Sequence, residues 1–203
     1  ELAVTSAIDR LLDVVKMRLD GESLSFIKRY VSEILPEKIV KTWRDFISIE
    51  RGTESDFLTS DILVPYGSTL LAGLLTDEFI CYVQLGDGVI VESFEKGVYH
   101  FPFGQGIFSD EKTDSMCLPT AARDMKVHFQ LIEDESPEFA LFTTDGFPNS
   151  YETENDFLLT VEAMRELCLS KLSNKEEQLD EWMQEITAKG SGDDITVALV
   201  FRS

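Results

Sequence analysis

The sequence is poor in cysteine and contains no apolar segment long enough to span a membrane. Its three cysteines, Cys81, Cys117 and Cys168, lie far apart and lack the Cys-x-x-Cys spacing that zinc and redox sites use. The most apolar segment, around residues 70–75, falls well short of the roughly 18 residues needed to cross a bilayer. We therefore expect reduced thiols in a cytoplasmic protein that has no membrane partner.

Positive charge is also scarce. Only 18 lysines and arginines oppose 38 aspartates and glutamates, which gives a net charge of −20. Binding to a phosphate backbone requires clustered cations, so nucleic acid is excluded as a partner. The length of 203 residues and the hydrophobic content of 43% suit a single domain over residues 1–203, because single cores grow to about 250 residues before a chain divides.

Helical periodicity dominates the first third of the chain. Ser23 is placed to cap a second helix, and Pro36 suits the first turn of a third. Because the helical pattern is already present at Glu1, we expect that residues upstream of it are missing. The apolar positions that predict the first helix, over residues 1–19, are Val4, Ile8, Leu11, Leu12, Val15 and Leu19.

Short runs of β-branched and aromatic residues follow, and they predict strands. The tight connections between the first three predict antiparallel hairpins, since a parallel crossover needs a dozen or more residues. Residues 97–125 are predicted to be irregular, and a further hairpin is expected from the last two runs. The predicted strands cover residues 68–75, 79–85, 89–94, 126–132 and 139–144.

Two more amphipathic helices and a last strand complete the pattern. The first helix has its apolar stripe between Phe157 and Cys168, and the capping box Ser173 to Glu176 is expected to start the second. Gly190 should end that helix in a left-handed conformation, and a strand follows up to Phe201. Helices, then strands, then helices and a strand indicate an α+β fold.

Aspartates stand at the expected ends of two strands. Asp145 follows an apolar run and precedes Gly146, which suits a metal ligand but also a turn or a helix N-cap. Asp193 and Asp194 precede the last strand, and two adjacent carboxylates repel each other unless a cation neutralises them. This favours a metal site, although a solvated turn would tolerate both charges. For a third aspartate, Asp87, a type I′ hairpin turn is the simpler explanation of its Gly-Asp-Gly sequence.

Four motifs occur together in a recognisable order. They are Gly67-Ser68-Thr69, Gln84-Leu85-Gly86-Asp87-Gly88, Thr143-Thr144-Asp145-Gly146 and Gly192-Asp193-Asp194-Ile195-Thr196-Val197. In this order and approximate spacing the chain resembles the protein phosphatase 2C family, the metal-dependent serine/threonine phosphatases, and among them the compact bacterial members. The resemblance implies a four-layer α-β-β-α sandwich of two antiparallel sheets flanked by helices.

The resemblance also implies a metal centre. It assigns a pair of Mg²⁺ or Mn²⁺ ions to Asp145 and Asp193, and makes Asp87 a candidate ligand of a third ion that several bacterial relatives bind. The sequence departs from the family at two positions, with Asp194 where Asn is usual and Gly88 where Ser is frequent. The first change adds negative charge beside the site, and the second removes a hydroxyl group.

Other family motifs have no counterpart here. The family carries an early acidic residue, an Asp-Gly motif that supplies the bridging metal ligand, and in many members a basic residue that holds the substrate phosphate. We expect these residues, and with them the missing N-terminal strands, upstream of Glu1, so no catalytic residue is assigned within the chain. Residues 1–203 alone are expected to show little turnover.

Two functions remain open at this stage. The resemblance implies hydrolysis of phosphoserine and phosphothreonine by a metal-activated water, in a monomeric enzyme whose substrate is a phosphorylated protein. The alternative is a non-catalytic, phosphatase-like binding or regulatory module, which the incomplete ligand set favours. A generic acidic interaction domain would explain the charge but not four ordered motifs.

Overall fold

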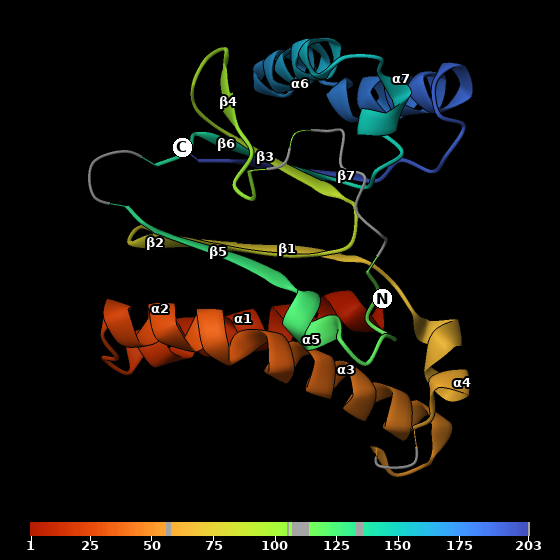
Figure 1. Ribbon diagram of the computed structural model, residues 1–203. Helices are drawn as coiled ribbons and strands as arrows, with labels where there is room; N and C mark the ends of the chain where they lie inside the picture. The colour runs from red at the N-terminus through yellow and green to blue at the C-terminus, as the bar shows by residue number, and fades with distance from the viewer. Residues whose placement is uncertain (56–57, 105, 107–113, 133–135, 203) are drawn as a thin grey trace. The chain divides into compact units, whose positions relative to one another are not determined.

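The computed structural model describes residues 1–55, 58–104, 106, 114–132 and 136–202 (Figure 1). It divides into two compact units, the first formed by residues 1–86 and 112–133 and the second by residues 87–111 and 134–203. Each unit contains one antiparallel sheet and helices that pack against it. Within the described residues, no helix is both long and apolar enough to cross a membrane.

The first unit combines a three-stranded sheet, in the order β1-β2-β5, with three long helices. Helix α1 packs on α3 and on β1, and α2 packs on β5. Trp43 of α3 is fully buried in the core of this unit. The elements are α1 (Leu2–Leu19), α2 (Leu24–Glu33), α3 (Leu35–Arg51), α4 (Ser60–Leu63), the 3-10 helix η2 (Val64–Tyr66), β1 (Leu70–Leu75), β2 (Phe79–Leu85), α5 (Ala121–Asp124) and β5 (Lys126–Leu131).

The second unit combines a four-stranded sheet, in the order β4-β3-β6-β7, with two helices on one of its faces (Figure 1). Its core joins residues of β3 and β6 to the buried side chains Phe147, Phe157, Val161 and Met164. The elements are β3 (Val89–Glu95), β4 (Val98–His100), β6 (Phe139–Thr143), the 3-10 helix η3 (Pro148–Ser150), α6 (Glu154–Leu169), α7 (Lys175–Lys189) and β7 (Val197–Phe201).

The predicted fold class is confirmed, because the chain forms two antiparallel sheets flanked by helices in an α+β order. Local signals for two helices are confirmed as well. The Ser23 hydroxyl accepts a hydrogen bond from the Phe26 backbone N–H at 3.2 Å, and Pro36 lies in the first turn of α3. Cys81 is buried, and all three cysteines are free thiols.

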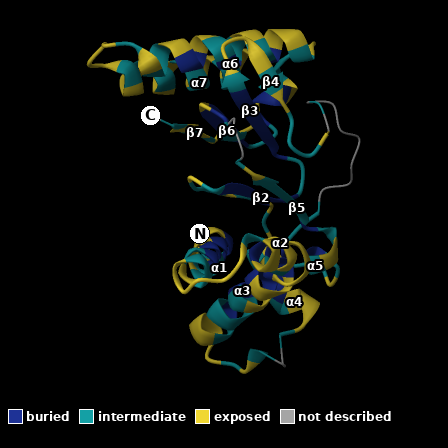
Figure 2. Ribbon diagram, turned by 90° about the vertical axis from the view of Figure 1, so that its left-hand side faces the viewer, coloured by how far each residue is buried: buried dark blue, intermediate teal, exposed yellow. Residues whose placement is uncertain are grey.

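Two predicted hairpins are wrong. The segment around Asp87 does not fold β3 back onto β2: β2 pairs with β1 and β5, whereas β3 pairs with β4 and β6. Strands β5 and β6 likewise belong to different sheets. The likelihood of a turn depends on local sequence, but strand partners are chosen by non-local burial. Strand β2 and the first five residues of β3 are buried without interruption (Figure 2), and each of these strands has a hydrogen-bonded neighbour on both sides.

The helix predicted over residues 1–19 is confirmed as α1, but its apolar pattern does not mark the buried face, although one member, Leu11, is buried at 5%. Val4, Ile8 and Leu12 are about half exposed, at 52%, 50% and 50%, whereas Ala3 and Ala7 are buried at 4% and 0%. The helix packs on both α3 and β1, and small side chains permit the close approach that two neighbours require. Size at the contact, rather than hydrophobicity alone, selects the buried face.

Two expectations about the second helical stretch need correction. Helix α7 begins at Lys175 with Asn174 as its N-cap and no capping hydrogen bond from a side chain, so the capping box from Ser173 to Glu176 is not formed. Gly190 does follow the helix, but at φ −101° and ψ −122° it is not left-handed. A Cβ atom there would lie 2.4 Å from the Ser150 Cβ, so close packing is what requires glycine at this position.

The region predicted to be irregular contains two short elements. Strand β4 forms a hairpin with β3 across Gly97, which has a φ of 80°, and α5 precedes β5. Residues 105 and 107–113 of this region, with Phe108 among them, lie outside the described residues.

Candidate functional site

The three predicted metal ligands lie in segments at one end of the strands of the second sheet. Strand register pairs Val89 at the start of β3 with Thr143 at the end of β6, and Thr143 with Val197 at the start of β7. Asp87 lies two residues before Val89, Asp145 lies two residues after Thr143, and Asp193 lies four residues before β7. Because neighbouring strands are about 4.8 Å apart, the antiparallel pairing brings the three segments to the same end of the sheet.

The electrostatics of Asp145 reflect the presence of the other two aspartates. The pKa of its carboxyl group is raised, first by burial and then by the negative charges of Asp87 and Asp193. Hydrogen bonds from its own backbone N–H and from that of Gly146 oppose this rise. A partly buried carboxylate that is repelled by two others is stabilised by a cation, because the cation offsets both the desolvation penalty and the repulsion.

Hydrogen bonds orient two of the carboxylates. The Asn149 side-chain amide donates to Oδ2 of Asp145 at 3.3 Å, and the Asp194 backbone N–H donates to Oδ1 of Asp193 at 2.9 Å. Asp194 also contributes its carbonyl oxygen, which accepts from the Thr144 hydroxyl group at 3.2 Å. These bonds hold the two carboxylates in fixed orientations.

Thr144 and Gly146 fasten the segment after β6 to the segment before β7. The Thr144 hydroxyl accepts from the Thr196 backbone N–H at 2.9 Å, and the Thr144 N–H donates to the Thr196 carbonyl at 3.1 Å. A Cβ atom on Gly146 would lie 2.7 Å from the Asp194 carbonyl oxygen. Glycine is thus required here for the close backbone contact that sets the separation of Asp145 from Asp193.

Two serines outside the predicted motifs, Ser150 and Ser191, form a second set of hydrogen bonds between the two loops. The hydroxyl groups of Ser150 and Ser191 both donate to the Gly146 carbonyl, at 2.8 and 2.9 Å. The Ser191 backbone N–H donates to the Ser150 hydroxyl at 3.2 Å, and the Asp193 N–H donates to the Ser191 hydroxyl at 3.3 Å. No local pattern indicates these roles, because the bonds that join Ser191 to Gly146 and to Ser150 link residues 45 and 41 positions apart in the chain.

The donor chemistry of this edge fits a hard divalent cation. The candidate ligands supply carboxylate oxygens, which Mg²⁺ and Mn²⁺ prefer, and Asp145 has the environment of a group that a cation would stabilise. The ligand set is small, however: in the part of the chain that the structure describes, no group of three or more His, Cys, Asp or Glu residues is placed to hold a metal ion.

Comparison with known proteins identifies the family. Residues 1–184 match the model of the family described as protein phosphatase 2C. No curated protein sequence matches the chain.

Solved structures share the fold at low sequence identity. The serine/threonine phosphatase Stp1 from Staphylococcus aureus is 12% identical with a TM-score of 0.55, over 94% of this chain and 75% of that one. The serine-threonine phosphatase 2C from Toxoplasma gondii is 12% identical with a TM-score of 0.54, over 98% and 78%. The S. agalactiae serine/threonine phosphatase is 16% identical with a TM-score of 0.53, over 98% and 81%.

Proposed function

The chain belongs to the protein phosphatase 2C family, and from this premise we propose that it serves the metal-dependent hydrolysis of phosphoserine and phosphothreonine in proteins. The single observation that carries the proposal is the convergence of Asp87, Asp145 and Asp193 at one edge of a sheet, with the pKa of Asp145 raised by burial and by the other two carboxylates. We further propose a cytoplasmic, monomeric protein whose partner is a phosphorylated protein.

In this proposal Asp145 and Asp193 hold the Mg²⁺ or Mn²⁺ pair, and Asp87 beside Asp145 is a ligand of a third ion. When bound, such ions lower the pKa of a coordinated water and align it with the phosphoester. The chain itself contributes rigid ligands. Asn149 holds one oxygen of Asp145, and Thr144 ties the backbone of the two loops together, so that the carboxylates need little rearrangement to receive a cation.

Manganese-dependent hydrolysis of p-nitrophenyl phosphate tests the activity. We expect the D145N and D193N variants of the full-length protein to lose about 100-fold or more in kcat/KM, since even outer-shell changes at metal sites cost about 10- to 100-fold. The matched control is D180N, which alters an exposed carboxylate on α7 that accepts from the Gln184 side chain. Equal activity of all four proteins would refute the assignment of the metal ligands.

A non-catalytic, phosphatase-like binding or regulatory module is the second candidate. The small ligand set favours it, because within the described residues no three acidic, histidine or cysteine side chains are grouped around a cation site. This alternative predicts that phosphopeptide is bound but not hydrolysed at any Mn²⁺ concentration. Turnover that depends on Mn²⁺ and on Asp145 would exclude it.

A further inference from the structure

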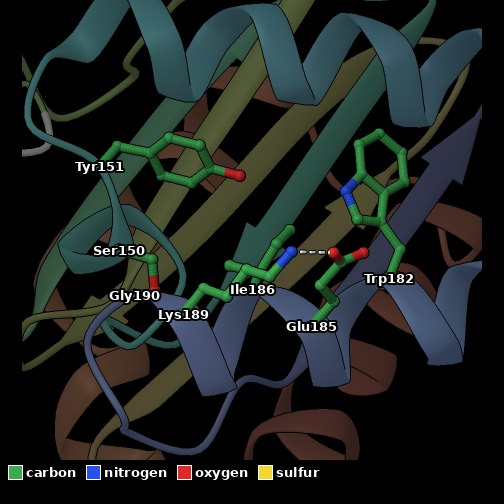
Figure 3. A pocket seen from close by; sticks show the side chains of 7 residues that line it. All are labelled: Ser150, Tyr151, Trp182, Glu185, Ile186, Lys189 and Gly190. Atoms are coloured by element: carbon green, nitrogen blue, oxygen red, sulfur yellow. Dashed lines mark hydrogen bonds and ion pairs between the residues drawn. The ribbon is translucent and has the colours of Figure 1, made fainter.

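A cavity of about 300 Å³ lies between the C-terminal half of α7 and the segment that follows η3 (Figure 3). Tyr151, Trp182 and Ile186 form its apolar walls, and Ser150 and Gly190 lie where the two segments meet. At its rim Lys189 forms an ion pair with Glu185, one turn earlier on α7. The rim therefore carries no net charge, and the cavity suits a neutral ligand.

The Tyr151 wall is held in place from behind. Its ring packs edge-on against Phe147 and Phe157, at centroid distances of 5.6 and 5.9 Å, and both phenylalanines are fully buried. Burial raises the pKa of the Tyr151 phenol, so the hydroxyl is neutral at physiological pH. A wall fixed in this way is formed before a ligand arrives, which reduces the entropy lost on binding.

Trp182 supplies one polar group to the wall of the cavity. Its indole nitrogen donates no hydrogen bond to any residue that the structure describes, and Figure 3 shows this nitrogen on the side of the ring that faces Tyr151. An indole N–H can only donate, so its natural partner is an acceptor such as a peptide carbonyl. An aromatic wall with one free donor is suited to a hydrophobic side chain and the carbonyl of its own backbone.

The volume limits the ligand to a small group. Ligand pockets range from about 300 to 1,000 Å³, so this cavity is at the lower end of that range. One hydrophobic side chain of a peptide, together with the adjoining backbone, fits within this volume and matches the apolar walls.

The cavity is joined directly to both loops of the candidate metal site. Ser150 binds the Gly146 carbonyl, one residue after Asp145, and the backbone of Ser191 binds the Ser150 hydroxyl. Through the Ser191 hydroxyl the same network reaches the backbone N–H of Asp193. A peptide held in the cavity would thus lie beside the segments that carry two of the proposed ligands.

We propose that this cavity is a docking pocket for one hydrophobic side chain of the protein substrate, whose peptide carbonyl accepts a hydrogen bond from Trp182. The identity of the ligand as a substrate segment rests on the proposed phosphatase function. The binding of a hydrophobic peptide residue by the cavity does not depend on catalysis, so the two ideas can fail separately.

Fluorescence anisotropy with labelled peptides tests the pocket. The probes are phosphoserine peptides in an alanine and serine background, each with one leucine at a different distance from the phosphoserine, together with their unphosphorylated forms. At one position we expect leucine to tighten binding about tenfold in both forms, as burial of one aliphatic side chain predicts. The same leucine should lower KM for the phosphopeptide.

Variants separate the pocket from other surfaces. W182A should abolish the preference for leucine, and W182F should retain most of it, because the ring remains while the N–H donor is lost. L159A is the matched control, since Leu159 is 62% exposed on α6 and lines no part of the cavity. Circular dichroism of each variant shows whether α7 is still folded.

Each outcome has a distinct meaning. In the full-length protein, leucine-dependent binding without any hydrolysis supports the pocket and refutes the phosphatase. Hydrolysis with no preference for leucine, or a preference that W182A retains, refutes the pocket. A concentration-dependent dimer that W182A dissociates would also overturn the proposal, because the cavity would then take a side chain from a second copy of the chain.

Discussion

At the residue scale, glycines and hydroxyl side chains decide the geometry of the candidate site. Gly146 allows its backbone to approach the Asp194 carbonyl, and Thr144 and Ser191 satisfy the backbone groups that this approach brings together. Buried backbone groups must be paired, so a close contact of two loops is stable only when side chains such as these complete the hydrogen bonding. The acidic residues are placed by neighbours that carry no charge.

The substitution G146A tests this account. The added methyl group would lie 2.7 Å from a backbone oxygen that cannot move independently, and we expect a loss of about 1–3 kcal/mol in the free energy of unfolding, as for other overpacked sites. Metal binding should weaken as well, because the two loops separate. Urea denaturation and isothermal titration with Mn²⁺ measure the two effects.

G97A serves as the comparison. Gly97 has a φ of 80° but no atom within 4 Å of an added Cβ, so its substitution should cost only the strain of a left-handed alanine, about 1–2 kcal/mol, and leave Mn²⁺ affinity unchanged. If G97A weakens Mn²⁺ binding as much as G146A does, the contact of Gly146 is not what positions the ligands.

Cys81 makes a prediction about alkaline pH. Burial raises the pKa of its thiol from 9.0 to about 12, so above pH 9 the unfolded chain releases a proton that the folded chain retains. Folded-state stability linked to this thiol is complete below pH 9 and is lost between pH 9 and about 12, at a slope of at most about 1.4 kcal/mol per pH unit. Urea midpoints measured across this range should fall less steeply for C81A. Identical slopes would show that the thiol is accessible to solvent.

At the element scale, the helices differ in whether they contribute fully buried residues to a core. Helices α1 and α3 contribute fully buried residues such as Ala7 and Trp43 to the core, whereas α7 contributes no buried residue. Helix α7 packs through a face that remains half-buried, including Leu179, Met183 and Ile186. A helix with so few buried residues unfolds locally more readily than its neighbours do. This helix also forms the wall of the proposed docking pocket.

The choice of buried face on α1 can be tested by substitution. A7L should lower the free energy of unfolding by about 1–3 kcal/mol, because Ala7 is 0% exposed between two packed elements. L12Q on the opposite side should change stability by less than about 0.5 kcal/mol, since Leu12 is 50% exposed. Chemical denaturation of both variants measures the two effects. If L12Q proved more destabilising than A7L, the face that carries Val4, Ile8 and Leu12 would be the buried one.

At the scale of the whole molecule, the net charge of −20 governs the response to ions. Like charges destabilise a compact state, and any added salt relieves this by screening. A specific cation site adds a second effect, because a ligand that binds only the folded state stabilises it by mass action.

Magnesium and sodium should therefore differ at equal ionic strength. We expect Mg²⁺ to raise the melting temperature further than Na⁺ does, by an amount that corresponds to about 2.7 kcal/mol when its concentration is 100 times the dissociation constant. The excess should disappear in D145N and persist in D180N. Equal melting temperatures in the two salts would mean that the acidic residues act only through their net charge.

The sequence by itself determined the α+β class, most strand positions, the cap at Ser23 and the three aspartates of the candidate site, because these depend on periodicity and on residues close in the chain. The tertiary structure alone decided that β2 and β3 enter different sheets, that the alanine face of α1 is buried, and that Ser150 and Ser191 lock the loops around Gly146. Strand pairing, helix packing and hydrogen bonds between distant loops depend on contacts between residues that are far apart in the sequence. Local sequence patterns do not specify those contacts.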